Sequence, residues 1–274
     1  MRHNFINALI MKKLALLLCT AVLLMMACQK EEPTPNEVDE AHAAPAQNYP
    51  STAEVIYDAV TDIDGNHYDA VKIGNQIWMA SNLRTTRYAD GEAIPDGKDT
   101  YGMTVPFRYQ SQTDLKSGGY LYNWIAVMRG RTTSSDANPS GVQGICPNGW
   151  HVPSDAEWDQ LTDYLSGHSE FVCSGSGTNI AKSLADDRDW NLDTWECSVG
   201  NDLSANNATG FSALPVGIFS EANYYGLGNS TSFWTTTIDC PTKSTYRNIM
   251  YALPTVNKNC GLRSVGNSVR CVKD

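Results

Sequence analysis

The sequence predicts an α+β fold, and three observations lead to this class. Residues 61–68 form an Asp-Gly turn between alternating segments, and residues 70–79 alternate apolar and polar side chains around a Gly-Asn turn, which indicates a small antiparallel meander. Residues 154–167 place apolar side chains at helical spacing between a helix start signal and a glycine. Residues 211–272 contain runs of β-branched and aromatic residues separated by Gly, Asn and Pro. This pattern indicates strands and turns, although strand spacing alone fits several α+β architectures.

The first residues have the pattern of a bacterial export signal. Lys12 and Lys13 precede an apolar run that is too short to span a bilayer permanently, and the small residue Ala27 precedes Cys28. This junction resembles the bacterial lipoprotein signal. The resemblance implies that residues 1–27 are removed and that Cys28 is acylated, with palmitate among the attached chains. An ordinary signal peptide with an incidental cysteine is the alternative.

Residues 28–52 are expected to form a flexible acidic tether, because they are charged, interrupted by proline and without apolar periodicity. Such a chain reaches about 25–30 Å, enough to hold a domain clear of lipid headgroups. The run Gln29-Lys30-Glu31-Glu32 resembles the surface-export signal of Bacteroidetes lipoproteins. It implies a lipid-anchored outer-membrane protein that faces the cell exterior, and generic tether acidity is the alternative reading.

The composition indicates an acidic globular domain. The chain of 274 residues has 20 Lys and Arg against 30 Asp and Glu, a net charge of −10. Removal of the signal, which contains Arg2, Lys12 and Lys13, makes the charge more negative. An acidic surface repels phosphate backbones, so we expect no nucleic-acid partner. The 7 Trp and 13 Tyr favour a compact domain over residues 53–274, long enough to bury one core.

Six cysteines remain after Cys19 leaves with the signal and Cys28 takes lipid. They are Cys146, Cys173, Cys197, Cys240, Cys260 and Cys271. An even number in an exported domain implies disulfides, although six cysteines allow many pairings. The preferred pairing is Cys146–Cys271, Cys173–Cys197 and Cys240–Cys260, in which the first bond joins an early helix to the last strand. No Cys-x-x-Cys spacing supports a zinc ribbon or a redox pair.

The segments of the domain differ in how clearly their sequence indicates a turn, a loop, a helix or a strand. Asp62, Asp64 and Asn66 are turn residues, since a calcium loop would require an acidic residue where Ile73 stands. Residues 90–119 are expected to be mostly loop, and residues 120–128 form a buried element of unresolved type. The predicted helix begins at Ser154, which forms a capping box with Glu157. The further strands are expected at residues 211–215, 232–238, 246–251 and 268–272.

Three stretches resemble the Fibrobacter succinogenes major paralogous domain. They are residues 62–66 with 73–83, residues 146–158, and residues 269–272. The resemblance runs from about residue 60 to residue 273 in family order. It implies a domain common on lipoproteins of Fibrobacter and Bacteroidetes, with no defined activity.

Residues 149–158 also resemble the G-W-R-L-P-T-E-A-E-W segment of formylglycine-generating and sulfatase-modifying domains. This implies a C-type-lectin-like fold, with an irregular antiparallel sheet, about two helices, long loops and disulfides. The catalytic parts are absent: the copper-binding oxidases need two closely spaced cysteines, whereas Cys260 and Cys271 are far apart. The iron-dependent relatives need an H-x-x-x-H-x-E cluster, whereas His67, His151 and His168 are scattered. We therefore expect no enzyme and a structural role for His151.

Two candidate sites lie in the loops. The densest set of oxygen ligands is a calcium candidate, with a solvated acidic loop inside the Cys173–Cys197 bridge as the default interpretation. Its members are Asp187, Asp189, Asn191, Asp193 and Glu196. Exposed aromatic rings stack on sugar faces, and the candidates for this role are Trp190, Trp195, Tyr224 and Tyr225. No cofactor is expected apart from calcium at the first of these sites.

The sequence therefore predicts a cell-surface lipoprotein whose domain binds a glycan or an envelope protein through its long loops. A diverged sulfatase-modifying or carbohydrate-active enzyme is one alternative, and it requires clustered metal ligands or reactive thiols. A structural adhesin subunit is the other alternative, and it requires a protein neighbour at the surface.

Overall fold

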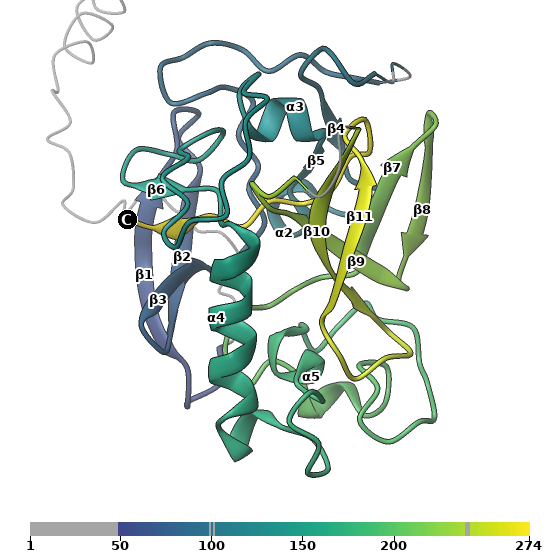
Figure 1. Ribbon diagram of the computed structural model, residues 1–274. Helices are drawn as coiled ribbons and strands as arrows, with labels where there is room; N and C mark the ends of the chain where they lie inside the picture. Colours follow the sequence, from purple (N-terminus) through teal and green to yellow (C-terminus); the bar gives the residue numbers. More distant parts are fainter. Residues whose placement is uncertain (1–48, 99, 101, 239–241) are drawn as a thin grey trace, which may run out of the picture. The chain divides into compact units, whose positions relative to one another are not determined.

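Two five-stranded sheets and one long helix dominate the fold (Figure 1). The computed structural model describes residues 49–98, 100, 102–238 and 242–274. The predicted signal, Cys28, most of the tether and Cys240 lie outside the described residues. The α+β class is confirmed, with irregular and largely antiparallel sheets.

The first sheet contains the meander predicted from the turn at residues 61–68 and the alternation of residues 70–79. In spatial order its strands are β1 (Glu54–Thr61), β2 (His67–Ile73), β3 (Gln76–Met79), β12 (Val272–Lys273) and β6 (Trp150–His151). The last strand is shorter than predicted, because residues 268–271 connect the two sheets instead. Trp234 N donates to Ser268 O at 3.2 Å, whereas Met79 N donates to Cys271 O at 3.0 Å.

The second sheet is built from the C-terminal half of the chain. In spatial order its strands are β11 (Asn257–Leu262), β10 (Lys243–Met250), β9 (Ser230–Trp234), β7 (Val216–Ser220) and β8 (Asn223–Leu227). Neighbouring strands are antiparallel except β7 and β9. The strand expected at residues 211–215 is absent, because the carbonyls of Phe211 and Ser212 accept hydrogen bonds from the Arg270 side chain.

Short elements fill the segments whose type the sequence left open. β4 (Arg108–Gln110) and α2 (Leu115–Gly118) lie in the region expected to be mostly loop. Residues 120–128 divide into β5 (Tyr120–Tyr122) and α3 (Trp124–Val127), because Asn123 ends the strand and caps the helix by accepting from Ala126 N. The other short helices among the described residues are α5 (Ala181–Leu184) and two 3₁₀ turns, Ser169–Phe171 and Leu203–Ala205.

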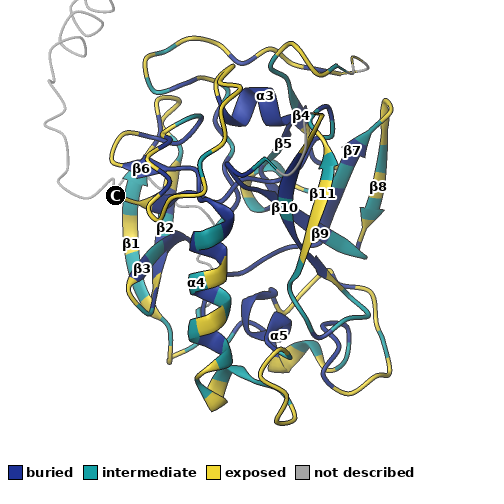
Figure 2. Ribbon diagram, viewed as in Figure 1, coloured by how far each residue is buried: buried dark blue, intermediate teal, exposed yellow. Residues whose placement is uncertain are grey.

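Helix α4 (Asp155–Ser166) lies between the two sheets (Figure 1), and the predicted capping box of Ser154 and Glu157 is present. One face of α4 is buried and the other exposed (Figure 2). The Trp158 ring lies 4.8 Å from the Trp78 ring of the first sheet and 5.6 Å from the Phe233 ring of the second. Trp158 therefore belongs to the core that joins both sheets, as its helical spacing predicted.

Two disulfides among the described residues join Cys146 to Cys271 and Cys173 to Cys197, the pairing preferred from the sequence. Cys146 lies in a turn before β6 rather than in a helix, so the first bond ties this turn to the C-terminal segment. The third predicted pair, Cys240–Cys260, involves a cysteine outside the described residues.

The Arg270 side chain forms hydrogen bonds to the first sheet and to the segment that precedes the second sheet. Its fully buried guanidinium donates to Asn82 Oδ1 at 2.8 Å, Met79 O at 3.0 Å and Ser212 O at 2.8 Å, and also to Phe211 O. It lies 4.5 Å from the centre of the Phe211 ring. Burial lowers the pKa of Arg270 to about 9. A planar group with several donors is suited to holding separated carbonyls in this way.

Candidate functional site

The turn at residues 62–66 is held by its own acidic side chains. Asp62 accepts hydrogen bonds from the backbone N–H groups of Asp64 and Asn66 and from the Tyr68 hydroxyl at 2.6 Å. Asp64 accepts from Thr86 Oγ1 at 2.9 Å. These carboxylates are engaged in holding the turn against the neighbouring chain, so the structure supports the turn interpretation over a calcium loop.

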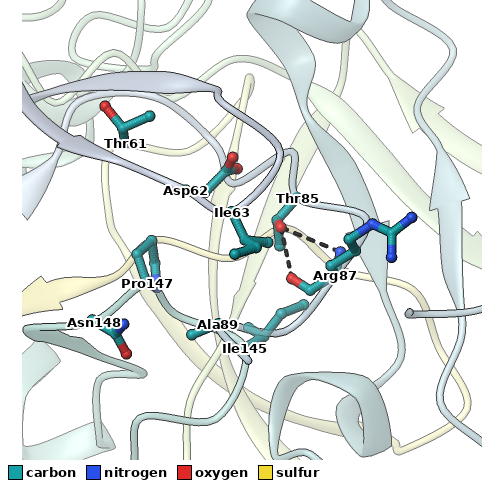
Figure 3. Close-up of a pocket in the computed structure, with 9 residues that line it drawn as sticks. All are labelled: Thr61, Asp62, Ile63, Thr85, Arg87, Ala89, Ile145, Pro147 and Asn148. Atoms are coloured by element: carbon teal, nitrogen blue, oxygen red, sulfur yellow. Dashed lines mark hydrogen bonds between the residues drawn. The ribbon is translucent and has the colours of Figure 1, made fainter. Parts of the chain in front are cut away.

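A shallow pocket beside this turn brings two of the sequence motifs together (Figure 3). Its volume is about 190 Å³, and it is lined by Thr61, Asp62, Ile63, Thr85, Arg87, Ala89, Ile145, Pro147 and Asn148. The Thr85 hydroxyl is committed to the Arg87 carbonyl at 2.7 Å, and the Arg87 side chain points away from the pocket (Figure 3). Ligand pockets usually measure about 300–1,000 Å³. This pocket is therefore a minor depression between motif segments.

His151, from the second motif, is buried between two carboxylates. Its Nε2 lies 2.6 Å from Glu157 Oε1, and its Nδ1 lies 2.7 Å from Asp274 Oδ1. Glu157 Oε2 also accepts from Ser154 N and Ser140 N. Burial by itself lowers the pKa of His151, but the hydrogen bonds and charges of Glu157 and Asp274 outweigh it and raise the pKa. His151 thus connects Asp274 to Glu157 in the first turn of α4.

Because Glu157 and Asp274 raise the pKa of His151, we expect the stability of the fold to depend on pH. A histidine whose pKa is raised on folding stabilises the protein fully below the unfolded value of about 6.5, and that contribution is lost as pH rises through the folded pKa. We expect the urea-unfolding free energy to fall over this window, and to fall less in His151→Gln. Two-dimensional NMR titration of the ring provides the direct measurement. A His151 pKa below the ordinary value would contradict the assignment.

The acidic loop does not gather its five calcium candidates. Asn191 Nδ2 donates to Asn229 Oδ1 at 2.7 Å, and Glu196 Oε1 accepts from Ser174 Oγ at 3.0 Å. Asp193 is half-buried, whereas Asp187 and Asp189 are exposed. Among the described residues, no group of three or more His, Cys, Asp or Glu side chains is placed to hold a metal ion. The loop is fastened instead by its hydrogen bonds and by the Cys173–Cys197 disulfide.

Two of the four aromatic candidates are exposed, Trp190 is buried and Tyr224 is half-buried. Trp195 is 57% exposed and Tyr225 is 50% exposed. The prediction for Trp190 is wrong, because its ring is buried in the core shared by the sheets and α4. Tyr224 also packs inward, with its ring 5.0 Å from that of Phe219. The alternation along β8 explains why Tyr224 packs inward while Tyr225 is exposed, since neighbouring side chains of a strand point to opposite faces.

Trp195 and Tyr225 are exposed on two segments, the acidic loop and the edge strand β8, that a backbone hydrogen bond joins. Asn191 N donates to Gly228 O at 2.8 Å, which places the loop along the turn after β8. Leu192 and Leu227, which the sequence analysis missed, flank this contact and are exposed. We call Leu192, Trp195, Tyr225 and Leu227 the Trp195 surface. Figure 2 shows β8 as one of the more exposed strands.

Among the described residues, the cysteine and histidines considered for sulfatase-modifying chemistry have other partners. Cys271 is bonded to Cys146, so its sulfur is not available as a thiolate ligand. His151 is held between Glu157 and Asp274, and His168 Nδ1 lies 2.7 Å from the carbonyl of Tyr164. His67 lies 2.7 Å from Asp58 on the first sheet. The three histidines occupy separate places with separate partners.

The motifs at Asp62, Cys146 and Arg270 thus each stabilise a junction of the fold. A model of the Fibrobacter succinogenes major domain (Fib_succ_major) matches residues 71–273. The chain belongs to this family. No curated protein and no solved structure matches the chain.

Membership assigns the Fib_succ_major domain to nearly all of the described residues, and the Trp195 surface lies within it. Its C-type-lectin-like architecture stays a prediction. Within the described residues of this Fib_succ_major chain, no helix combines the length and apolarity that a membrane crossing requires.

Proposed function

We propose that this Fib_succ_major domain is a non-catalytic, lectin-like module that binds a glycan chain on the Trp195 surface. The observation that carries the proposal is the exposure of Trp195 and Tyr225 on a loop and strand held side by side by the Asn191–Gly228 hydrogen bond. Exposed aromatic rings supply apolar faces and polar edges at little conformational cost, which suits them to sugar rings.

The surroundings of the Trp195 surface favour a polymer over a small molecule. The exposed amides of Asn191 and Asn229 pair at 2.7 Å beside it, and Asn223 lies on the same face of β8 as Tyr225. These groups donate to and accept from sugar hydroxyls. The surface lies on an edge strand and a loop, and the pocket at Asp62 is too small for a typical ligand. An extended, neutral glycan fits an open surface on a chain of net charge −10.

We further propose that the domain works at the cell exterior. Acylated Cys28 would anchor it to the outer membrane, and the acidic tether would hold the binding surface clear of the headgroups. The disulfides among the described residues support an oxidising compartment. An envelope or extracellular polysaccharide is therefore the proposed ligand.

Replacing Trp195 by alanine is expected to weaken glycan binding about tenfold, the effect of losing about 1.4 kcal/mol from an aromatic anchor. Tyr225→Ala is expected to act in the same direction. The measurement is a glycan-array screen of the purified domain, followed by calorimetric titration of the best ligand. Tyr57→Ala is the matched control, because Tyr57 is 71% exposed on β1 of the other sheet.

Equal affinity of the wild type and of Trp195→Ala would contradict the assignment of the surface. Absence of binding to every glycan, with and without calcium, would contradict the glycan proposal. In that case surface cross-linking in the native bacterium distinguishes a protein-binding adhesin subunit, because it traps a protein neighbour of the domain.

A further inference from the structure

The ammonium group of Lys182 lies beneath the loop that carries Trp195, in a position that would suit a bound cation. The side chain starts from the short helix α5 and is only 8% exposed. Its Nζ donates to the backbone carbonyls of Ser198 at 3.3 Å and Asp202 at 3.2 Å, and also to that of Asn201. Carbonyl oxygens that converge on one point are the ligands that calcium takes in protein loops. Here an ammonium group holds them.

The backbone around Lys182 is shaped to aim these carbonyls inward. Cys197 and Asp202 have positive φ values of 73° and 48°, which turn the chain at both ends of the segment. Asn206 Nδ2 donates to Val199 O at 3.2 Å, so a neighbouring carbonyl of the segment also points inward. An uncompensated buried ammonium is costly, and its three acceptors offset that cost.

The same segment is directly connected to Trp195. Ser198 N donates to Trp195 O at 3.0 Å, and Cys197 is tied to Cys173. Asp193 N donates to Gly200 O at 3.0 Å, which links the other side of the Trp195 turn to the segment. Displacement of the carbonyls around Nζ would therefore move the turn that presents the indole ring.

We infer that Lys182 is a positioning residue that acts as a built-in cation for the Trp195 loop, so that the Trp195 surface forms without bound calcium. This inference rests on the proposed function only where binding is measured, because the order of the loop is measurable without a ligand. The inference also explains why the five calcium candidates of the acidic loop are spread apart. The positive charge of this region comes from Lys182, so the loop does not need a bound metal ion. Burial lowers the pKa of Lys182, while the charge of Asp202 opposes that shift.

The test is hydrogen exchange of the amides of Ser198, Asn201 and Ala205, which donate within or beside the segment. Lys182→Met, which keeps an unbranched side chain one atom shorter and removes the charge, is expected to raise their exchange rates at least tenfold. Amides of β2 and β3 in the first sheet should keep their protection. Lys72→Met is the control, since exposed Lys72 pairs with Glu54 at 3.0 Å on the first sheet. Unchanged protection of the three amides in Lys182→Met would overturn the inference.

Three further measurements use the wild-type protein or Lys182→Ala. The wild-type Lys182 Nζ–H groups are expected to give an NMR signal protected from solvent, and a rapidly exchanging ammonium would contradict the inference even if Lys182→Met failed to fold. Methylammonium is expected to restore amide protection in Lys182→Ala. A chelator should leave wild-type loop exchange unchanged, and loss of protection on chelation would show a metal-dependent loop. A domain with a protected loop and no glycan binding would refute the proposed function alone.

Discussion

Replacing Cys146 and Cys271 together by alanine is expected to lower the free energy of unfolding by about 5 kcal/mol. The bond closes a loop with a sequence separation of 125, and in the chain-entropy description the constraint on the unfolded state grows with loop length. Both cysteines are fully buried, so the substitution also removes core contacts. Urea denaturation of the oxidised wild type and of the double variant gives the difference directly.

The second disulfide provides an internal comparison. Cys173 and Cys197 are separated by 24 residues, for which the same description predicts a loss of about 3–4 kcal/mol. We therefore expect the Cys146/Cys271 variant to be the less stable of the two. The opposite order would show that the longer bond does not stabilise the fold chiefly through the unfolded chain. The Cys173/Cys197 variant should also loosen the Trp195 loop, because Cys197 lies within the turn that runs from Trp195 to Ser198.

Elements with a strong local signal could be predicted from the sequence. Helix α4 follows from the capping box of Ser154 and Glu157 and from the helical spacing of Trp158, Leu161 and Leu165, all of which involve neighbouring residues. The β1–β2–β3 meander follows from alternation and two short turns. Such signals suffice wherever nearby residues determine the backbone.

Segments governed by distant partners could not be predicted in the same way. Residues 211–215 have the composition of a strand, but Arg270 donates to the carbonyls of Phe211 and Ser212 and fixes them outside a regular ladder. Residues 268–272 look like one strand, yet their hydrogen bonds are divided between two sheets. Composition cannot reveal which distant side chain takes a carbonyl.

The candidate site also combines features that the sequence shows locally with features that depend on distant residues. The sequence singled out the loop that contains Trp195, because acidic and aromatic residues are concentrated there. It could not separate exposed Trp195 from buried Trp190, since both have polar neighbours and no regular periodicity. It also could not assign a role to Lys182, because the three carbonyls that surround Nζ come from residues 198–202, on the far side of the acidic loop.

Replacing Cys28 by alanine is expected to remove all palmitate label from the protein and to shift it from the membrane fraction to the soluble fraction. Each buried CH₂ of an acyl chain contributes about 0.8 kcal/mol, and two or more chains give stable anchoring. Cys28 lies outside the described residues, and the prediction rests on the lipoprotein-like junction of Ala27 and Cys28. Metabolic labelling and fractionation of the native host measure both effects.

Cys19→Ala is the matched control, because Cys19 lies within the segment expected to be removed. It should leave labelling and membrane attachment unchanged, so that any effect of Cys28→Ala is specific to the junction and not to loss of a cysteine. Soluble, unlabelled protein from both the wild type and Cys28→Ala would support the ordinary signal peptide instead. That outcome would keep the oxidising compartment, and with it the two disulfides, but would remove the anchor from the proposed function.

The glycan-binding test with Trp195→Ala is independent of the anchor, so the location and the binding activity can be accepted or rejected separately.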